Sequence, residues 1–213
     1  FRSQAGNSWV VPQSGEGYTG PGIASLDQFG RRNGNGGGAS QFNNCTIARS
    51  AGGGSNGTQG SGGTHGEYGF IVGNSSLTSL FFGGGGGGGG RGCEVGVGAG
   101  SGGSGGGIII INANSLSIVG TGSISVRGGN PGIDTNTNGQ GAEGGGASGG
   151  AGAGGSVLIK VVNGQVASNQ IIATGGAGTS ALAGYNGQGG NGRIRIEYCE
   201  SLSGTTNPAA STQ

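Results

Sequence analysis

Apolar residues along this chain fall into short blocks that glycines separate. The clearest block, Gly105 to Gly129, reads as glycines, an apolar strand, a turn that contains Asn, a second short strand and a Gly-Gly stop. Ala153 to Gly176 repeats this order, Gly69 to Gly84 is a weaker copy, and Gly189 to Gly204 supplies a last strand. Ile and Val together outnumber Leu by 26 to 7, and this excess of β-branched residues favours strands over helices.

The spacing of the blocks predicts a stacked repeat. From Ile108 to Val157 the offset is 49 residues, and from Gly128 to Gly175 it is 47. A repeat of this length that is poor in apolar residues cannot form a core alone, so neighbouring repeats must stack to be stable.

Two of the blocks indicate which side chains lie inside. The run Ile108 to Ile111 is apolar on both faces of a strand, so we expect it at the centre of the molecule. Alternate residues of a strand point to opposite faces. The last block is therefore expected to place Ile194, Ile196 and Tyr198 on one face and Arg193, Arg195 and Glu197 on the other.

Glycine makes up 62 of the 213 residues and concentrates in two fields, 83–107 and 139–155. Such runs are either flexible linkers or ordered polyproline-II-like strands, which have no internal hydrogen bonds and need neighbours. The fields contain Ala, Ser, Val, Cys and Glu rather than repeated Ser and lead directly into apolar strands, which favours ordered packing. We predict an all-β fold: a repetitive, β-solenoid-like array of layered short strands with packed polyglycine-II-like segments.

Three regions are expected along the chain. Residues 1–68 form an irregular N-terminal region, residues 69–204 the glycine-rich β repeat region, and residues 205–213 a C-terminal tail or a linker into missing sequence. The chain begins with Phe1 and contains no Met, which suggests that a leader or a longer N-terminal region is missing from this sequence.

Charge and hydropathy exclude several classes of protein. Only 17 residues are charged and the net charge is +1, with no cluster of Lys or Arg, so nucleic acid is not an expected partner. No run of 18 apolar residues exists to span a membrane, and a collagen helix would need a strict Gly-X-Y period. The neutral, Ser- and Thr-rich composition fits a secreted or cell-surface protein better than a cytosolic enzyme.

Enzyme chemistry is not predicted. Patterns of the type G-x-S-x-G around Ser104 and Ser148 are expected by chance at this glycine content. The single His, His65, lies with Glu67 in a glycine-rich stretch, whereas acid–base catalysis needs a positioned group with a tuned pKa. A polysaccharide-degrading β-helix enzyme needs clustered acids, and the eight acids are scattered. No catalytic residue is assigned.

One segment resembles the first half of a calcium-binding loop. Asp134, Asn136 and Asn138 precede Gly139, and alternate oxygen ligands followed by a glycine are typical of such loops. The twelfth position is Gly145 rather than an acid. An Asn-rich turn is the alternative interpretation. Apart from this candidate calcium site, no cofactor is expected.

Three cysteines cannot all pair within one chain. Cys45 and Cys93 are 48 residues apart, close to the repeat offset, so stacking would make them neighbours and a disulfide between them is a hypothesis. Cys199 would then bond to missing sequence or to another subunit, or it is simply buried.

The order of the blocks carries a resemblance to a known class of protein. GGGGGGGG, then GGSGGGIIIINANSLSIVGTGSISVRGG, then GGGASGGAGAGGSVLIKV and finally GGNGRIRIEYCESLSGTTNPA resemble the glycine-rich repeat regions of large bacterial cell-surface proteins, over roughly Gly69 to Ala210. The glycine fields are also similar in style to the polyglycine-II bundles of phage tail-tip adhesins and of a snow-flea antifreeze protein, although a sustained Gly-x-x period is absent. This resemblance implies a secreted β-solenoid-like scaffold.

Two functions are therefore expected as alternatives. The first is a non-enzymatic extracellular structural protein, a self-assembling surface or filament subunit, because unpaired end strands offer free backbone groups to another copy. The second is an adhesin that recognises a cell-surface glycan or protein through aromatic residues. Its candidates are Tyr68, Phe70, Phe81, Phe82 and Tyr185, for which burial against glycine faces is the competing interpretation.

Overall fold

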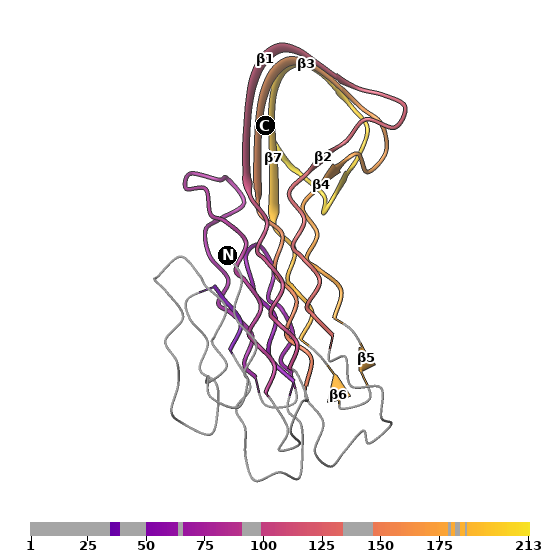
Figure 1. Cartoon of the computed structure of the whole chain (residues 1–213). Coiled ribbons are helices and arrows are strands. Elements are labelled where there is room, and N and C mark those ends of the chain that lie inside the picture. The colour runs from indigo at the N-terminus through magenta and orange to yellow at the C-terminus, as the bar shows by residue number, and fades with distance from the viewer. Residues whose placement is uncertain are drawn as a thin grey trace.

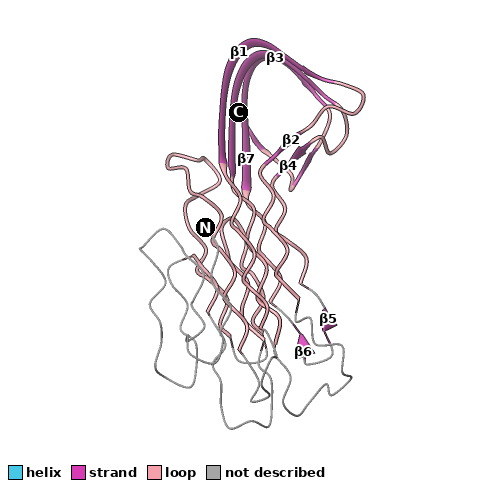
Figure 2. Ribbon diagram, viewed as in Figure 1, coloured by secondary structure: helices cyan, strands magenta, loops and turns pink. Residues whose placement is uncertain are grey.

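The computed structural model describes residues 35–38, 50–63, 66–90, 99–133, 147–178, 180–181, 184–185 and 187–213. These residues contain strands and no helix (Figure 2), so the prediction of a sheet-rich fold is confirmed for them. The strands are β1 (Ile108–Ile118), β2 (Ile124–Ser125), β3 (Ser156–Val166), β4 (Ile171–Ile172), β5 (Ser180–Ala181), β6 (Gly184–Tyr185), β7 (Arg193–Ser203), β8 (Thr206–Asn207) and β9 (Ser211–Thr212).

The long strands form one parallel sheet and the short strands form a second. The first sheet has the order β1-β3-β7-β9 and the second the order β2-β4-β8, while β5 and β6 form a separate antiparallel pair. Figure 1 shows β1, β3 and β7 running side by side, bending together, and returning through the short strands. Each long strand, with its turn and short strand, therefore repeats one path and lies against the next.

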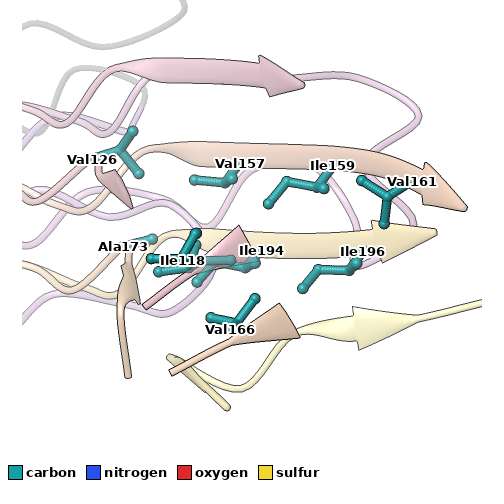
Figure 3. Packing of buried hydrophobic residues seen from close by; sticks show 10 residues of the cluster. Ile118, Val126, Val157, Ile159, Val161, Val166, Ala173, Ile194 and Ile196 are labelled. Atoms are coloured by element: carbon teal, nitrogen blue, oxygen red, sulfur yellow. The ribbon is translucent and has the colours of Figure 1, made fainter. Parts of the chain in front are cut away.

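The apolar core lies between these two parallel sheets (Figure 3). The register aligns Ile111 with Ile159 and Ile159 with Ile196, so that like residues form a ladder across the long strands. Ile159 and Ile171, from the middle strand of each sheet, are 0% exposed. Burial of such a side chain contributes about 1.5–3 kcal/mol, so the middle strand–turn–strand unit holds the most completely buried part of the core.

The glycine-rich segments 83–90, 99–107 and 147–155 are hydrogen-bonded to one another in a closed ring. The first segment donates to the second, the second to the third, and the third back to the first, always at every third residue. The donors are Gly83, Gly86 and Gly89, then Gly100, Gly103 and Gly106, then Ala147, Gly150 and Ala153, with N···O distances of 2.8–2.9 Å. Figure 1 shows these extended segments continuing away from the sheets.

The close approach of these segments depends on the absence of side chains. A Cβ on Gly103 would lie 2.1 Å from the carbonyl oxygen of Gly129, and a Cβ on Gly150 would lie 2.0 Å from that of Gly52. Ordinary contact begins only at 3.4 Å. Glycine is therefore required at such positions for space, and the entropic cost of ordering it is offset by backbone hydrogen bonds that would otherwise go to water.

Two expectations about the strands are wrong. The run Ile108 to Ile111 does not lie at the centre, because β1 is an edge strand and Ile110 is 62% exposed. Residues 69–84 contain no strand. This segment has turns instead, with Leu77 at a φ of 46°, because no neighbouring strand pairs with its backbone.

The repeat offset and the position of the first turn also differ from the prediction. Ile109, not Ile108, aligns with Val157, so the offset is 48 residues. A slip of one residue exchanges the two faces of a strand, which is why Ile109 rather than Ile108 packs on the core. The chain stays extended through Asn112, because its backbone pairs with β3, and the turn lies later, where Gly122 donates to Val119.

Candidate functional site

Residues 69–82 cross the outer face of the long sheet at its base. Ser156 Oγ at the start of β3 donates to the Phe81 carbonyl oxygen at 2.7 Å, and Arg193 Nη2 at the start of β7 donates to that of Val72 at 3.1 Å. Ser211 Oγ on β9 donates to the carbonyl oxygen of Ser75 at 2.6 Å. Burial under this segment lowers the pKa of Arg193. The segment thus fixes the base of three strands and covers part of the face.

Charged side chains further along the same sheet pair with one another. Lys160 Nζ lies 2.9 Å from Glu197 Oε2, and Arg195 Nε donates to Glu197 Oε1 at 2.8 Å. The hydrogen bond from Arg195, with a second from Lys160, holds the pKa of Glu197 below its ordinary value of 4.5. A carboxylate with a lowered pKa and two cationic partners is a structural ion pair rather than a general acid or base.

The alternation predicted for the last strand is only partly confirmed. Ile194 and Ile196 are buried in the core, and Arg195 and Glu197 bond to each other away from it. Tyr198 is exposed instead of buried, because the register between β3 and β7 shifts after Val161 and breaks the regular alternation.

Several candidates from the sequence lie outside the described residues. These are the calcium candidates Asp134, Asn136 and Asn138, the disulfide candidates Cys45 and Cys93, and His65. Among the described residues, no group of three His, Cys, Asp or Glu side chains could hold a metal ion. Cys199 is exposed and carries a free thiol, so the expectation that it is buried is wrong.

The aromatic candidates separate into two groups. Phe70 and Phe82 are about half exposed, at 48% and 52%, whereas Tyr68 and Phe81 are partly buried. The side chain of Tyr185 lies outside the described residues. Gly83 donates to Gly106, and this bond places Phe82 beside the glycines that lead into β1. Burial against glycine therefore does not account for Phe70 and Phe82.

The outer edge of β1 is a feature that the sequence did not predict. In the described part of the chain, β1 pairs with β3 only, and it presents the exposed Ile110. A signal for this arrangement was available: counting back 48 residues from Ile108 reaches Gly60, where the sequence has no apolar run. The missing block upstream means that no repeat of the same kind can cover β1 from that side.

A shallow hollow of about 220 Å³ lies at the opposite end of the core. Its apolar lining includes Val166, Ile196, Leu202 and Ala210, with Thr206 contributing a polar wall. No Asp, Glu, His, Lys or Arg lines it. The hollow has room for apolar side chains and lacks the groups that orient a polar substrate.

No protein-family model, curated protein or solved structure matches the chain. In the described residues, no helix has the length and apolar character needed to cross a membrane. The function must therefore be argued from the geometry of the chain itself.

Proposed function

We propose that this chain is a non-enzymatic structural protein of the extracellular space or cell surface that associates with other copies of itself. The observation that carries the proposal is the closed ring of hydrogen bonds among 83–90, 99–107 and 147–155. Extended segments bonded to three-fold neighbours at every third residue correspond to a polyglycine-II bundle. Glycine then serves as a packing surface, which suits a scaffold.

The sheets support a solenoid-like interpretation of the same scaffold. Unit one, β1 and β2, aligns with unit two, β3 and β4, at offsets of 48 and 47 residues, and unit two aligns with β7 and β8 in the same parallel sense. Units that contact only their neighbours leave an end layer half covered. Ile109 and Ile111 of unit one are such a layer, since they are only partly buried. Covering this layer favours self-association.

The paired charges support a structural role over a catalytic one. Glu197 is engaged by both Lys160 and Arg195, and the hollow near Ile196 has no titratable lining. The calcium loop at Asp134, Asn136 and Asn138 stays a prediction. Isothermal titration with Ca²⁺ tests it, and absence of heat would favour the Asn-rich turn.

Sedimentation velocity and negative-stain electron microscopy of the purified chain, over a series of rising concentrations, test the proposal. We expect the mean sedimentation coefficient to rise with concentration and the micrographs to show discrete assemblies. A single monomeric species at every concentration would refute self-association as the function.

An adhesin is the second candidate, and the exposure of Phe70 and Phe82 favours it. Half-exposed rings can stack on the apolar face of a sugar or fill a pocket in a partner protein. A glycan array probed with the wild-type chain and with a Phe70→Ala, Phe82→Ala variant tests this role. Specific binding that the double variant loses would support the adhesin, and no binding by the wild type would count against a glycan ligand.

A further inference from the structure

The two edges of the long sheet are covered to different extents. β9 pairs with β7 at Arg195 and Ile196, and Tyr198 also donates its backbone N–H to Gln213 at 3.0 Å. No described segment pairs with the outer side of β1, which is 11 residues long. Figure 1 shows β1 as the outermost of the long strands. A long edge strand of this kind is a template for another strand.

The backbone groups of this edge point outward at alternate residues. Ser156 donates to the carbonyl oxygen of Gly107 at 3.1 Å, which sets the phase of the ladder between β1 and β3. In a parallel pair, alternate residues bond to the same neighbour. Ile109 and Ile111 therefore bond to β3, whereas Ile108, Ile110 and Asn112 direct their N–H and C=O groups away from it.

Exposed apolar side chains accompany these backbone groups. Ile110 is the most exposed large apolar residue of the described chain, and Val119, just after β1, is also exposed. Phe82 lies beside the glycines that lead into β1. β1 contains no charged residue. The opposite edge ends in Ser211 and Thr212, which are polar, so an apolar edge finds its complement in a second copy of itself.

We propose that β1 pairs antiparallel with β1 of a second copy of this chain, across a two-fold axis at Ile110. This register sets Ile110 opposite Ile110 of the second copy, Ile109 opposite Ile111, and Ile108 opposite Asn112. Opposite residues of an antiparallel pair share a face, so core-facing residues meet core-facing residues. The outward backbone groups of Ile108, Ile110 and Asn112 then exchange hydrogen bonds with their opposites.

This pairing rests on the proposed self-association and narrows it. The same edge is used in both copies, so the contact is isologous and closes on itself. A closed dimer is expected from this edge rather than an open filament. Because β1 carries no charge, no like charges meet at the axis, where they would oppose pairing.

Ile110→Lys tests the pairing, with Val119→Lys as the matched control, since both residues are exposed and β-branched and only the first lies in the strand. We expect the wild type and Val119→Lys to dimerise alike in sedimentation equilibrium. Ile110→Lys places two like charges opposite each other and should weaken dimerisation by about tenfold or more. Circular dichroism of both variants checks that the fold is kept.

A cross-link gives a second readout that does not depend on affinity. Directly opposite residues of a hydrogen-bonded antiparallel pair have Cα atoms about 5.5 Å apart, which suits a disulfide. Under mild oxidation, Ile110→Cys should yield a peptide that joins position 110 to position 110 of the second copy, and Val119→Cys should not yield the corresponding one.

The outcomes separate the pairing from the proposed function. A wild-type chain that stays monomeric refutes both. A wild-type chain that associates while Ile110→Lys associates equally well, with no link at position 110, refutes the β1 pairing and leaves self-association standing. Open filaments that persist in the Ile110→Lys variant would also overturn it.

Discussion

Replacing Gly106 by Ala tests whether the glycines are required for space. A Cβ at Gly106 would lie 2.1 Å from the carbonyl oxygen of Val126 and 2.5 Å from the backbone nitrogen of Gly155. Ordinary contact begins at 3.4 Å, so the segments must separate by roughly 1.3 Å, more than a close-packed interior absorbs without strain.

The separation acts on hydrogen bonds as well as on packing. Gly106 donates to Ala153 at 2.8 Å and accepts from Gly83 at 2.9 Å, so moving it strains both bonds of the ring. Overpacking costs about 1–3 kcal/mol, and each backbone bond contributes about 0.5–1.5 kcal/mol. We expect Gly106→Ala to lower the free energy of unfolding by about 2–5 kcal/mol.

The next residue provides a matched control. A Cβ at Gly107 meets nothing within 4 Å, and its φ is outside the left-handed region. Gly107→Ala should leave stability unchanged or raise it by about 0.4–1 kcal/mol, since Ala restricts the unfolded chain. Urea unfolding followed by far-UV circular dichroism gives the two midpoints. Equal midpoints for the two variants would refute the argument that glycine serves as a packing surface.

Three further predictions concern buried and paired side chains. Asn56 is 1% exposed and donates Nδ2 to the Gly154 carbonyl oxygen at 2.8 Å; Asn56→Ala should cost about 1–3 kcal/mol in urea unfolding, whereas the exposed Asn114→Ala should cost under about 0.5 kcal/mol, and equal losses would contradict the buried bond. Ile159→Val should cost about 0.5–1.5 kcal/mol, while Ile110→Val should be nearly neutral; a larger loss at Ile110 would show that β1 is not an edge strand. The lowered pKa of Glu197 stabilises the fold above its unfolded value of 4.5, and this contribution is lost as the pH falls through the lower folded value. The stability of the wild type should therefore decline more steeply below that pH than that of Glu197→Gln, and parallel pH profiles would argue against the ion pairs with Lys160 and Arg195.

Local pattern was sufficient to locate the principal strands. β1, β3 and β7 coincide with the apolar runs that follow glycine fields, and β2 and β4 with the shorter stretches after them. The reason is physical: β-branched residues fit a pleated, half-buried surface. Segment 69–84 failed because its residues also favour strands, but no neighbour pairs with its backbone, and a strand depends on its partners.

Register and edge position could not be predicted from the sequence. An offset of 48 rather than 49 residues decides that Ile109 faces the core and Ile110 faces solvent, because the side-chain period of a strand is 2. The ion pairs of Glu197 with Lys160 likewise depend on the alignment of β3 with β7. The outer edge of β1, the surface proposed for dimerisation, exists only because of the sheet order.

The sequence by itself determined that glycine and β-branched residues alternate in blocks, and hence that the described chain is sheet-rich without helices. Only the tertiary structure decided which segments meet: 83–90, 99–107 and 147–155 come together through backbone bonds. Glycine carries no side chain to specify a partner, so its neighbours are set by the strands that flank it. The apolar strands thus position the glycine segments, and the missing side chains allow those segments to pack.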